Sequence, residues 1–159
     1  MNQKILLASN VPESNDKQFG DFDVISIREA LKGVLEAVSE SRKTKYDLVN
    51  VQYPAVTLLL KQASESLGKN LEVITYTNVD KYKFAAGFFI GGDQKIVDIY
   101  ETFKASNPSA FKFPIPTTGG AARFLYSREG IIQNQKITDE LRNDFRYLLV
   151  AKHCLECLM

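Results

Sequence analysis

Two pairs of adjacent glycines mark the places where this chain could approach a ligand most closely. Gly91-Gly92 follows an apolar run, and Gly119-Gly120 follows the hydroxyl pair Thr117-Thr118. Because glycine has no Cβ, the backbone there can come within hydrogen-bond distance of a phosphate or a ribose. The threonine hydroxyls could bind the same phosphate, and the N–H groups that begin a following helix favour negative charge. We therefore expect residues 117–120 to be the main anion contact, where a side chain at Gly120 blocks the ligand and leaves the core undisturbed.

Charged side chains beside these turns could complete such a site. Lys95 lies in the first turn after the first glycine pair, and Arg123 lies one turn after the second, so either could bind a phosphate. Asp98 and Glu101 are three residues apart in a predicted helix and therefore share a face. A carboxylate beside a ribose could serve a glycosidic hydrolase as nucleophile or as general acid or base. For each of the four residues, an ordinary exposed side chain is the more common interpretation.

Alternating strands and helices would bring these residues to one edge of a sheet. Short β-favouring runs predict strands, and apolar residues at three- and four-residue steps predict helices between them; the strands are expected at residues 4–8, 47–51, 71–76, 84–90 and 111–115. This pattern predicts one α/β domain over residues 1–159, with a Rossmann-like, doubly wound and mostly parallel sheet. Ligands bind such sheets beyond the carboxyl ends of the strands, which adds Ser9, Asn10 and Tyr53 to the candidate site. One glycine pair could simply make a tight turn, but two pairs after predicted strands favour a ligand-binding edge.

Several residues predict where the helices begin and end. Ser26 and Glu29 have the spacing of a capping box near the start of the first helix, which could also begin two residues earlier. Three further signals are a proline at a first helical position, an N-cap aspartate and a C-cap glycine, namely Pro54, Asp93 and Gly68.

The end of the chain predicts one last helix that begins at Thr138. Its apolar residues, which include Phe145, Leu148 and Leu155, are more than one helix face can hold. Part of this surface could therefore meet a second copy of the chain in a homo-oligomer. A helix packed across the sheet with a frayed apolar end fits the pattern equally well.

Composition and charge exclude several classes of protein. The 159 residues are 45% hydrophobic and carry a net charge of +1, which fits a globular domain without the clustered positive charge that nucleic acids require. No segment approaches the ~20 apolar residues that span a bilayer, and the short apolar run at residues 5–8 is no signal peptide, so we expect a cytoplasmic protein. Cys154, Cys157 and the single histidine, His153, fall short of the four ligands of a structural zinc site. We expect neither a metal nor a cofactor.

The glycine turns, taken in order, resemble the SLOG superfamily of Rossmann-like domains, which is related to the Lonely Guy proteins. The specific segments are Gly91-Gly92, with Tyr100-Glu101 downstream, and Pro-Ile-Pro-Thr-Thr-Gly-Gly-Ala-Ala at residues 114–122, within a resemblance that spans residues 4–126. It implies a nucleotide-derived ligand, such as a nucleotide, NAD or an ADP-ribose derivative, often sensed in antiviral defence or nucleotide signalling. Only residues 77–83 separate the third and fourth strands, which allows either one helical turn in a parallel crossover or an antiparallel hairpin. The resemblance favours the helical turn.

The sequence departs from the pattern of the hydrolases in this superfamily. Those members carry Pro-Gly-Gly-x-Gly-Thr-x-x-Glu, where this chain has Ile90 for the proline, Gln94-Lys95 for Gly-Thr and Asp98 for the glutamate. We therefore expect binding or sensing with little or no hydrolysis of NAD or nucleoside monophosphates. One alternative is an N-glycosidic hydrolase or transferase for a nucleotide or NAD-like substrate, with Glu101, which matches a recurrent family acid, or Asp98 at the ribose. The other is a degenerate domain that serves oligomerisation or scaffolding.

Overall fold

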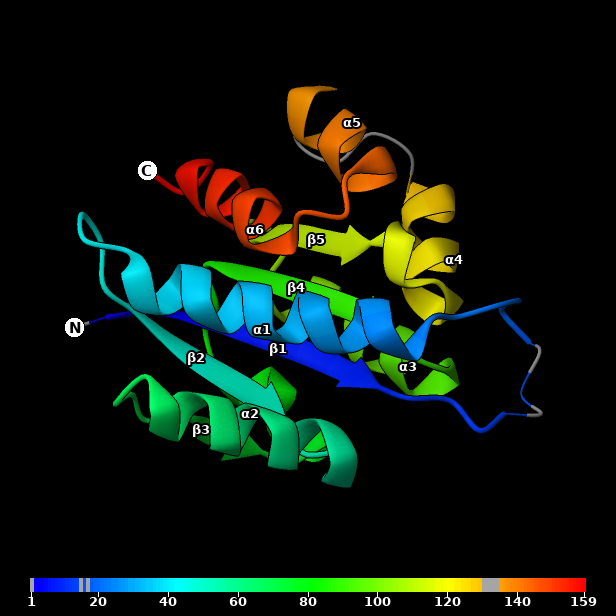
Figure 1. Ribbon diagram of the computed structural model, residues 1–159, viewed down its shortest axis with the longest axis horizontal. Helices are drawn as coiled ribbons and strands as arrows, with labels where there is room; N and C mark the ends of the chain where they lie inside the picture. The colour runs from blue at the N-terminus through cyan, green and yellow to red at the C-terminus, as the bar shows by residue number, and fades with distance from the viewer. Residues whose placement is uncertain (1, 15, 17, 130–134) are drawn as a thin grey trace.

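A five-stranded parallel sheet forms the centre of the computed structural model, which describes residues 2–14, 16, 18–129 and 135–159 (Figure 1). The strands lie in the order β3-β2-β1-β4-β5. Their bounds are Gln3–Asn10 for β1, Tyr46–Val51 for β2, Glu72–Ile74 for β3, Ala86–Gly91 for β4 and Phe111–Ile115 for β5. All four strand pairs are parallel, which confirms the predicted Rossmann-like α/β fold in a single domain.

Helices cover both faces of the sheet because each central strand is apolar on both sides. In β1, Ile5 and Leu7 join the core beneath α1, α2 and α6, whereas Leu6 and Ala8 join the core beneath α3. Figure 1 shows α1 and α2 in front of the sheet and α3 behind it. The helix bounds are Val24–Glu40 for α1, Pro54–Ser66 for α2, Gln94–Ser106 for α3, Gly120–Glu129 for α4, Gln135–Asn143 for α5 and Tyr147–Glu156 for α6.

The connection from β3 to β4 is the short helical turn and not the hairpin. It is a 3₁₀-helix, η1, at Tyr76–Lys81, whose Val79 is fully buried against the α3 side of the sheet. β3 pairs with β2, and β4 pairs with β1, so the chain crosses two strands between them. A second 3₁₀-helix, η2, at Pro116–Thr118 leads from β5 into α4.

The predicted capping box at the start of α1 is wrong, and the alternative start two residues before Ser26 is confirmed, since α1 begins at Val24. Asp23 caps this helix instead: its carboxylate accepts a hydrogen bond from the Ile25 N–H at 3.0 Å and from the Ser26 hydroxyl at 2.9 Å. Ser26 therefore lies inside the first turn, bonded to the cap. The other three end signals, Pro54, Asp93 and Gly68, are confirmed at the start of α2, the start of α3 and the end of α2.

The single last helix is also wrong, because the chain turns between α5 and α6. The Asp144 carboxylate accepts from the Arg146 N–H at 2.8 Å and from its guanidinium at 2.7 Å, and this local pairing competes with helical hydrogen bonds. Thr138 consequently lies within α5 and does not cap a helix. The turn leaves Phe145 62% exposed while α6 buries its apolar face against α1. Contact with a second copy of the chain stays a prediction.

None of the helices in the described part of the chain is both long and apolar enough to cross a membrane.

Gly33 lies where α1 and α6 cross, and we expect a side chain there to destabilise the fold. A Cβ on Gly33 would lie 2.8 Å from Leu148 N and from the Tyr147 carbonyl carbon, and backbone atoms cannot rotate away. Gly33→Ala should therefore lower the free energy of unfolding by about 1–3 kcal/mol, although alanine is the better helix former. Urea denaturation measures this, and Lys32→Ala, at an exposed position of α1, is the control, expected to stay within about 0.5 kcal/mol of wild type. A Gly33→Ala protein more stable than wild type would show that the helices do not cross this closely.

Candidate functional site

The two glycine pairs lie together at the carboxyl edge of the sheet, as predicted. The Gly91 N–H donates to Thr118 Oγ1 at 2.8 Å, and the Ala121 N–H donates to the Gly92 carbonyl at 2.9 Å. A Cβ on Gly120 would lie only 2.6 Å from the same carbonyl. The two turns therefore pack directly against each other, next to the point between β1 and β4 where the winding of the sheet reverses and where such folds usually bind ligands.

The threonine hydroxyls of the second turn have protein partners. Thr118 is fully buried, and besides accepting from the Gly91 N–H its hydroxyl donates to the Ile115 carbonyl at 2.6 Å. The hydroxyl of Thr117 lies 3.0 Å from the Tyr147 hydroxyl of α6. In this arrangement both hydroxyls form hydrogen bonds within the protein.

Residues 18–23, which precede α1, form backbone hydrogen bonds with the same turn. The Gly120 N–H donates to the Asp21 carbonyl at 3.1 Å, and the Asp23 N–H donates to the Thr118 carbonyl at 3.3 Å. Phe22 forms an isolated β-bridge with Gly119. Of the N–H groups at the start of α4 that were expected to hold an anion, those of Gly120 and Ala121 therefore already have acceptors within the protein.

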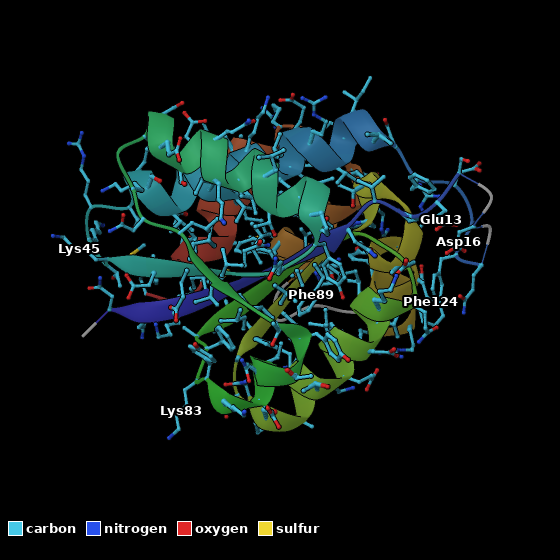
Figure 2. All side chains as sticks on the ribbon, turned by 90° about the horizontal axis from the view of Figure 1, so that it is seen from below. Glu13, Asp16, Lys45, Lys83, Phe89 and Phe124 are labelled. Carbon is cyan, nitrogen blue, oxygen red and sulfur yellow. The ribbon has the colours of Figure 1, made fainter. Side chains whose placement is uncertain are left out.

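Side chains of this segment contact the helices on either side of the glycine turns. The Phe19 ring centroid lies 4.9 Å from that of Phe124 on α4, and the Gln18 amide donates to Gln94 of α3 at 3.0 Å. In Figure 2, Glu13 and Asp16 lie at the same end of the molecule as Phe124, away from Lys45 and Lys83. Residues 18–23 thus cover the β4–β5 part of the carboxyl edge.

Ser9 and Asn10 end β1 beneath this segment. Asn10 Oδ1 accepts from the Asp93 N–H at 3.0 Å and so fixes the entry to α3. Ser9 is fully buried, and its hydroxyl has no hydrogen-bond partner among the described residues. Both predicted residues therefore lie at the expected edge, but inside the protein.

Glu101 and Arg123 lie apart from the other candidates. Glu101 pairs with Arg128, whose guanidinium also contacts Glu129 at 3.0 Å and lies 5.7 Å from the centre of the Tyr100 ring. Glu101 thus belongs to an ion-pair cluster between α3 and α4. Arg123 is exposed and forms no ion pair with any residue that the structure describes.

A cleft of about 620 Å³ opens beside α3, at the carboxyl ends of β2 and β3. We call it the tyrosine cleft, and its lining residues are Gln52, Tyr53, Tyr76, Lys95, Asp98, Ile99 and Thr102. It brings together three of the predicted site residues, Tyr53, Lys95 and Asp98. Sequence reasoning missed Tyr76, although that residue follows the third strand as Tyr53 follows the second. It also missed Thr102, which lies one helical turn beyond Asp98.

A buried chain of hydrogen bonds positions Tyr53 just beyond the carboxyl end of β2. The Tyr53 N–H donates to Thr57 Oγ1 at 3.1 Å, and the Thr57 hydroxyl donates to Asn50 Oδ1 at 2.8 Å. Asn50 in turn donates to the Leu7 carbonyl of β1 at 3.1 Å. One wall of the cleft is therefore anchored to the centre of the sheet.

Burial and negative charge keep the Tyr53 hydroxyl protonated. Burial of the ring raises the pKa of Tyr53, and the carboxylates of Asp93 and Asp98 raise it further because they disfavour a phenolate. The Asp98 carboxylate accepts from the Gln94 amide at 2.8 Å, and the Lys95 ammonium lies 3.6 Å from the carboxylate of Asp93. The cleft therefore offers hydroxyl and amide groups, one carboxylate and one partly compensated cation.

No group of three or more histidine, cysteine, aspartate or glutamate side chains that could hold a metal ion occurs within residues 2–14, 16, 18–129 and 135–159. His153 pairs with Glu140 of α5 at 2.7 Å, and burial raises the pKa of the Cys154 thiol.

Gly120 and Gly68 together allow the contact between the glycine turns to be measured. Both have a left-handed backbone, with φ of +57° and +64°, but a Cβ on Gly68 would meet nothing within 4 Å. Gly68→Ala should therefore lose only the conformational term of about 1–2 kcal/mol in the free energy of unfolding. Gly120→Ala should lose about 1–3 kcal/mol more, because the Cβ overlaps the Gly92 carbonyl. Urea denaturation of both variants decides this, and equal losses would mean that the two turns do not depend on close packing.

A larger loss of stability in Gly120→Ala than in Gly68→Ala would contradict the expectation that a side chain at Gly120 leaves the core undisturbed. The reason would be that a Cβ at Gly120 lies 2.6 Å from the Gly92 carbonyl oxygen.

The comparison with known protein families agrees with this geometry. A model of the SLOG cluster3 family matches residues 68–155, which are more than half of the chain and include both glycine turns and most of α3 to α6. No curated protein matches the sequence. The chain therefore belongs to the SLOG cluster3 family.

Proposed function

We propose that this domain binds a nucleotide-derived small molecule in the tyrosine cleft. SLOG domains commonly bind such ligands, and parallel α/β sheets bind them at the carboxyl ends of their strands. The observation that carries the proposal is the convergence there of two tyrosines with Lys95, Asp98 and Thr102 in one cavity of about 620 Å³. A cavity of this size, with an apolar wall and a few polar groups, suits a small organic ligand.

The lining residues divide into two kinds of contact. Tyr53 and Tyr76 present aromatic rings on which a base can stack, a contact worth about 1–3 kcal/mol per base. Asp98 can accept hydrogen bonds from sugar hydroxyls, in the way that an acidic residue binds ribose in related nucleotide-binding folds. Gln52 and Thr102 can hydrogen-bond the edge of a base or a further hydroxyl.

Binding without turnover is the function that these residues support best. Glu101, the acid expected to act in a hydrolase, pairs with Arg128 outside the cleft. Asp98 is the one carboxylate that lines the cleft, and Gln94-Lys95 replace the Gly-Thr of the hydrolases. A sensing role in nucleotide signalling or antiviral defence is the corresponding biological proposal.

Removal of the Tyr76 ring should weaken this binding without disturbing the fold. Tyr76 is 65% exposed, so Tyr76→Ala should melt as wild type does in the absence of ligand. The screen uses nucleosides, nucleotides, NAD, ADP-ribose and cyclic dinucleotides, and a ligand that binds the native state raises the melting temperature of wild type. For any such ligand, Tyr76→Ala should raise the dissociation constant by about tenfold, the equivalent of one lost stacking contact.

Phe145→Ala is the matched control, because Phe145 is 62% exposed and lies outside the tyrosine cleft. Its affinity should equal that of wild type. If every ligand found bound Tyr76→Ala as tightly as wild type, or if none of the panel bound wild type, the proposed function would be rejected.

A further inference from the structure

We infer that two copies of this chain associate through the exposed side of α1, with the two α1 helices antiparallel across a two-fold axis. The surface is a group of exposed apolar residues around the first turn of α1, which we call the α1 patch: Val11, Val24, Ile25, Leu58 and Phe145. The tyrosine cleft lies beside α3, which Figure 1 shows behind the sheet, whereas α1 lies in front of it. Association through the α1 patch therefore leaves the cleft open and is independent of the ligand proposed for it.

Exposed apolar side chains are concentrated at this one place. In the part of the chain that the structure describes, nine large apolar side chains are exposed, and the α1 patch holds five of them. Val24 and Ile25, at the start of α1, are 43% and 72% exposed. A single exposed apolar residue is ordinary on a monomer, but a cluster of them marks a surface that another molecule covers.

Two grooves, one on each side of α1, connect the residues of the patch. The groove between α1 and α2 has a volume of about 290 Å³ and is lined by Val11, Val24 and Leu58. The groove between α1 and α6 has a volume of about 650 Å³, and its lining includes Ile25 and Phe145. Figure 1 shows α1 between α2 and α6. A helix that lies along α1 can therefore place apolar side chains into both grooves.

Neither the cap nor the core accounts for the apolar residues in the first turn of α1. Asp23 caps the helix, and the first turn itself contains no acidic residue, although the helix dipole favours acids there. Valine and isoleucine are also weaker helix formers than glutamate, glutamine or lysine. Val24 and Ile25 do not belong to either hydrophobic core. Burial of both side chains against a partner would supply the stabilisation that they lack in the single chain.

The charges on α1 favour a second copy of the chain as that partner. Arg28, Glu29, Lys32 and Glu36 follow one another along the helix with alternating sign, and all four line one of the two grooves. A strongly acidic or strongly basic partner would meet like charges as often as opposite ones. A two-fold interface brings the same surface of both copies together, so it needs both signs on one patch. The α1 patch meets this condition.

The positions of two neighbouring charges favour the antiparallel arrangement. Arg28 is exposed and forms no ion pair with any residue that the structure describes. Glu29 has only a loose pair with Lys32, at 3.9 Å, in which both side chains are well exposed. Where two antiparallel α1 helices cross at these positions, Arg28 of each copy lies opposite Glu29 of the other. The first turns of both helices, with Val24 and Ile25, then lie within the contact, because they are only one helical turn away.

Sedimentation equilibrium of the full chain over a range of concentrations tests this association. The mass of the wild type should rise with concentration from that of one chain to that of two. Ile25→Asp should raise the dimer dissociation constant by about a hundredfold, because it places an unpaired charge in the contact in both copies. Leu67→Asp is the matched control and should associate as wild type does, since Leu67 is 41% exposed at the end of α2 and lines neither groove.

Two results of this experiment would overturn the inference. One is a wild type that stays monomeric at every concentration, which would leave the α1 patch to a different partner. The other is a dimer that Ile25→Asp weakens no more than Leu67→Asp does, which would place the contact on another surface.

Charge reversal tests the antiparallel pairing without any change to Ile25. Arg28→Glu and Glu29→Arg should each raise the dimer dissociation constant by about tenfold, because each places like charges opposite one another twice in the dimer. The double variant Arg28→Glu/Glu29→Arg restores opposite charges and should return to within about threefold of the wild-type constant. Lys61→Glu is the control, since Lys61 is exposed on α2 and lines neither groove. A double variant that associates no better than the single variants would overturn the inference.

Discussion

The close approach of the two glycine turns determines how the carboxyl edge of the sheet is built. Gly120 can lie against the Gly92 carbonyl only because it has no Cβ, and the contact is closed by the bonds from Gly91 to Thr118 and from Ala121 to Gly92. These bonds are buried, so loss of one partner would leave an unpaired polar group at a cost of about 1–3 kcal/mol. The starting points of α3 and α4, and hence the position of every side chain that they carry, depend on this junction.

The junction also divides the edge into a closed part and an open part. Over β4 and β5, the backbone of residues 21–23 and the two glycine turns hydrogen-bond one another, and these polar groups stabilise the fold. Over β2 and β3, the turn at Tyr53 and the start of η1 at Tyr76 leave a cleft along α3. Family membership places this domain among relatives that commonly bind nucleotide-derived ligands, and the proposed binding site in this chain lies on the tyrosine side of the edge.

The sequence predicted most strands and helices well, but it did not predict which polar groups find partners within the protein. Strand β5 and the helix ends at Pro54, Asp93 and Gly68 depend on local propensity and periodicity, which the sequence displays directly. Whether a donor is vacant depends on partners far along the chain, as with Thr118, whose hydroxyl accepts from Gly91, 27 residues away. The same holds for Glu101, whose partner Arg128 is also 27 residues away. The prediction of one continuous last helix failed for a different reason. The short-range pairing of Asp144 with Arg146 outweighed the helical pattern of the sequence, and the chain breaks between α5 and α6.

The most direct test of this division is to map ligand contacts residue by residue, with the amide resonances of isotope-labelled protein followed by NMR during titration with each ligand that raises the melting temperature of wild type. The account predicts that the largest shift changes occur at Tyr53, at Tyr76 and in the first half of α3 from Lys95 to Thr102, and that residues 117–123 change little. Shift changes concentrated at Gly91, Gly92 and residues 117–123, with the tyrosines unaffected, would contradict it and would place the ligand at the glycine turns.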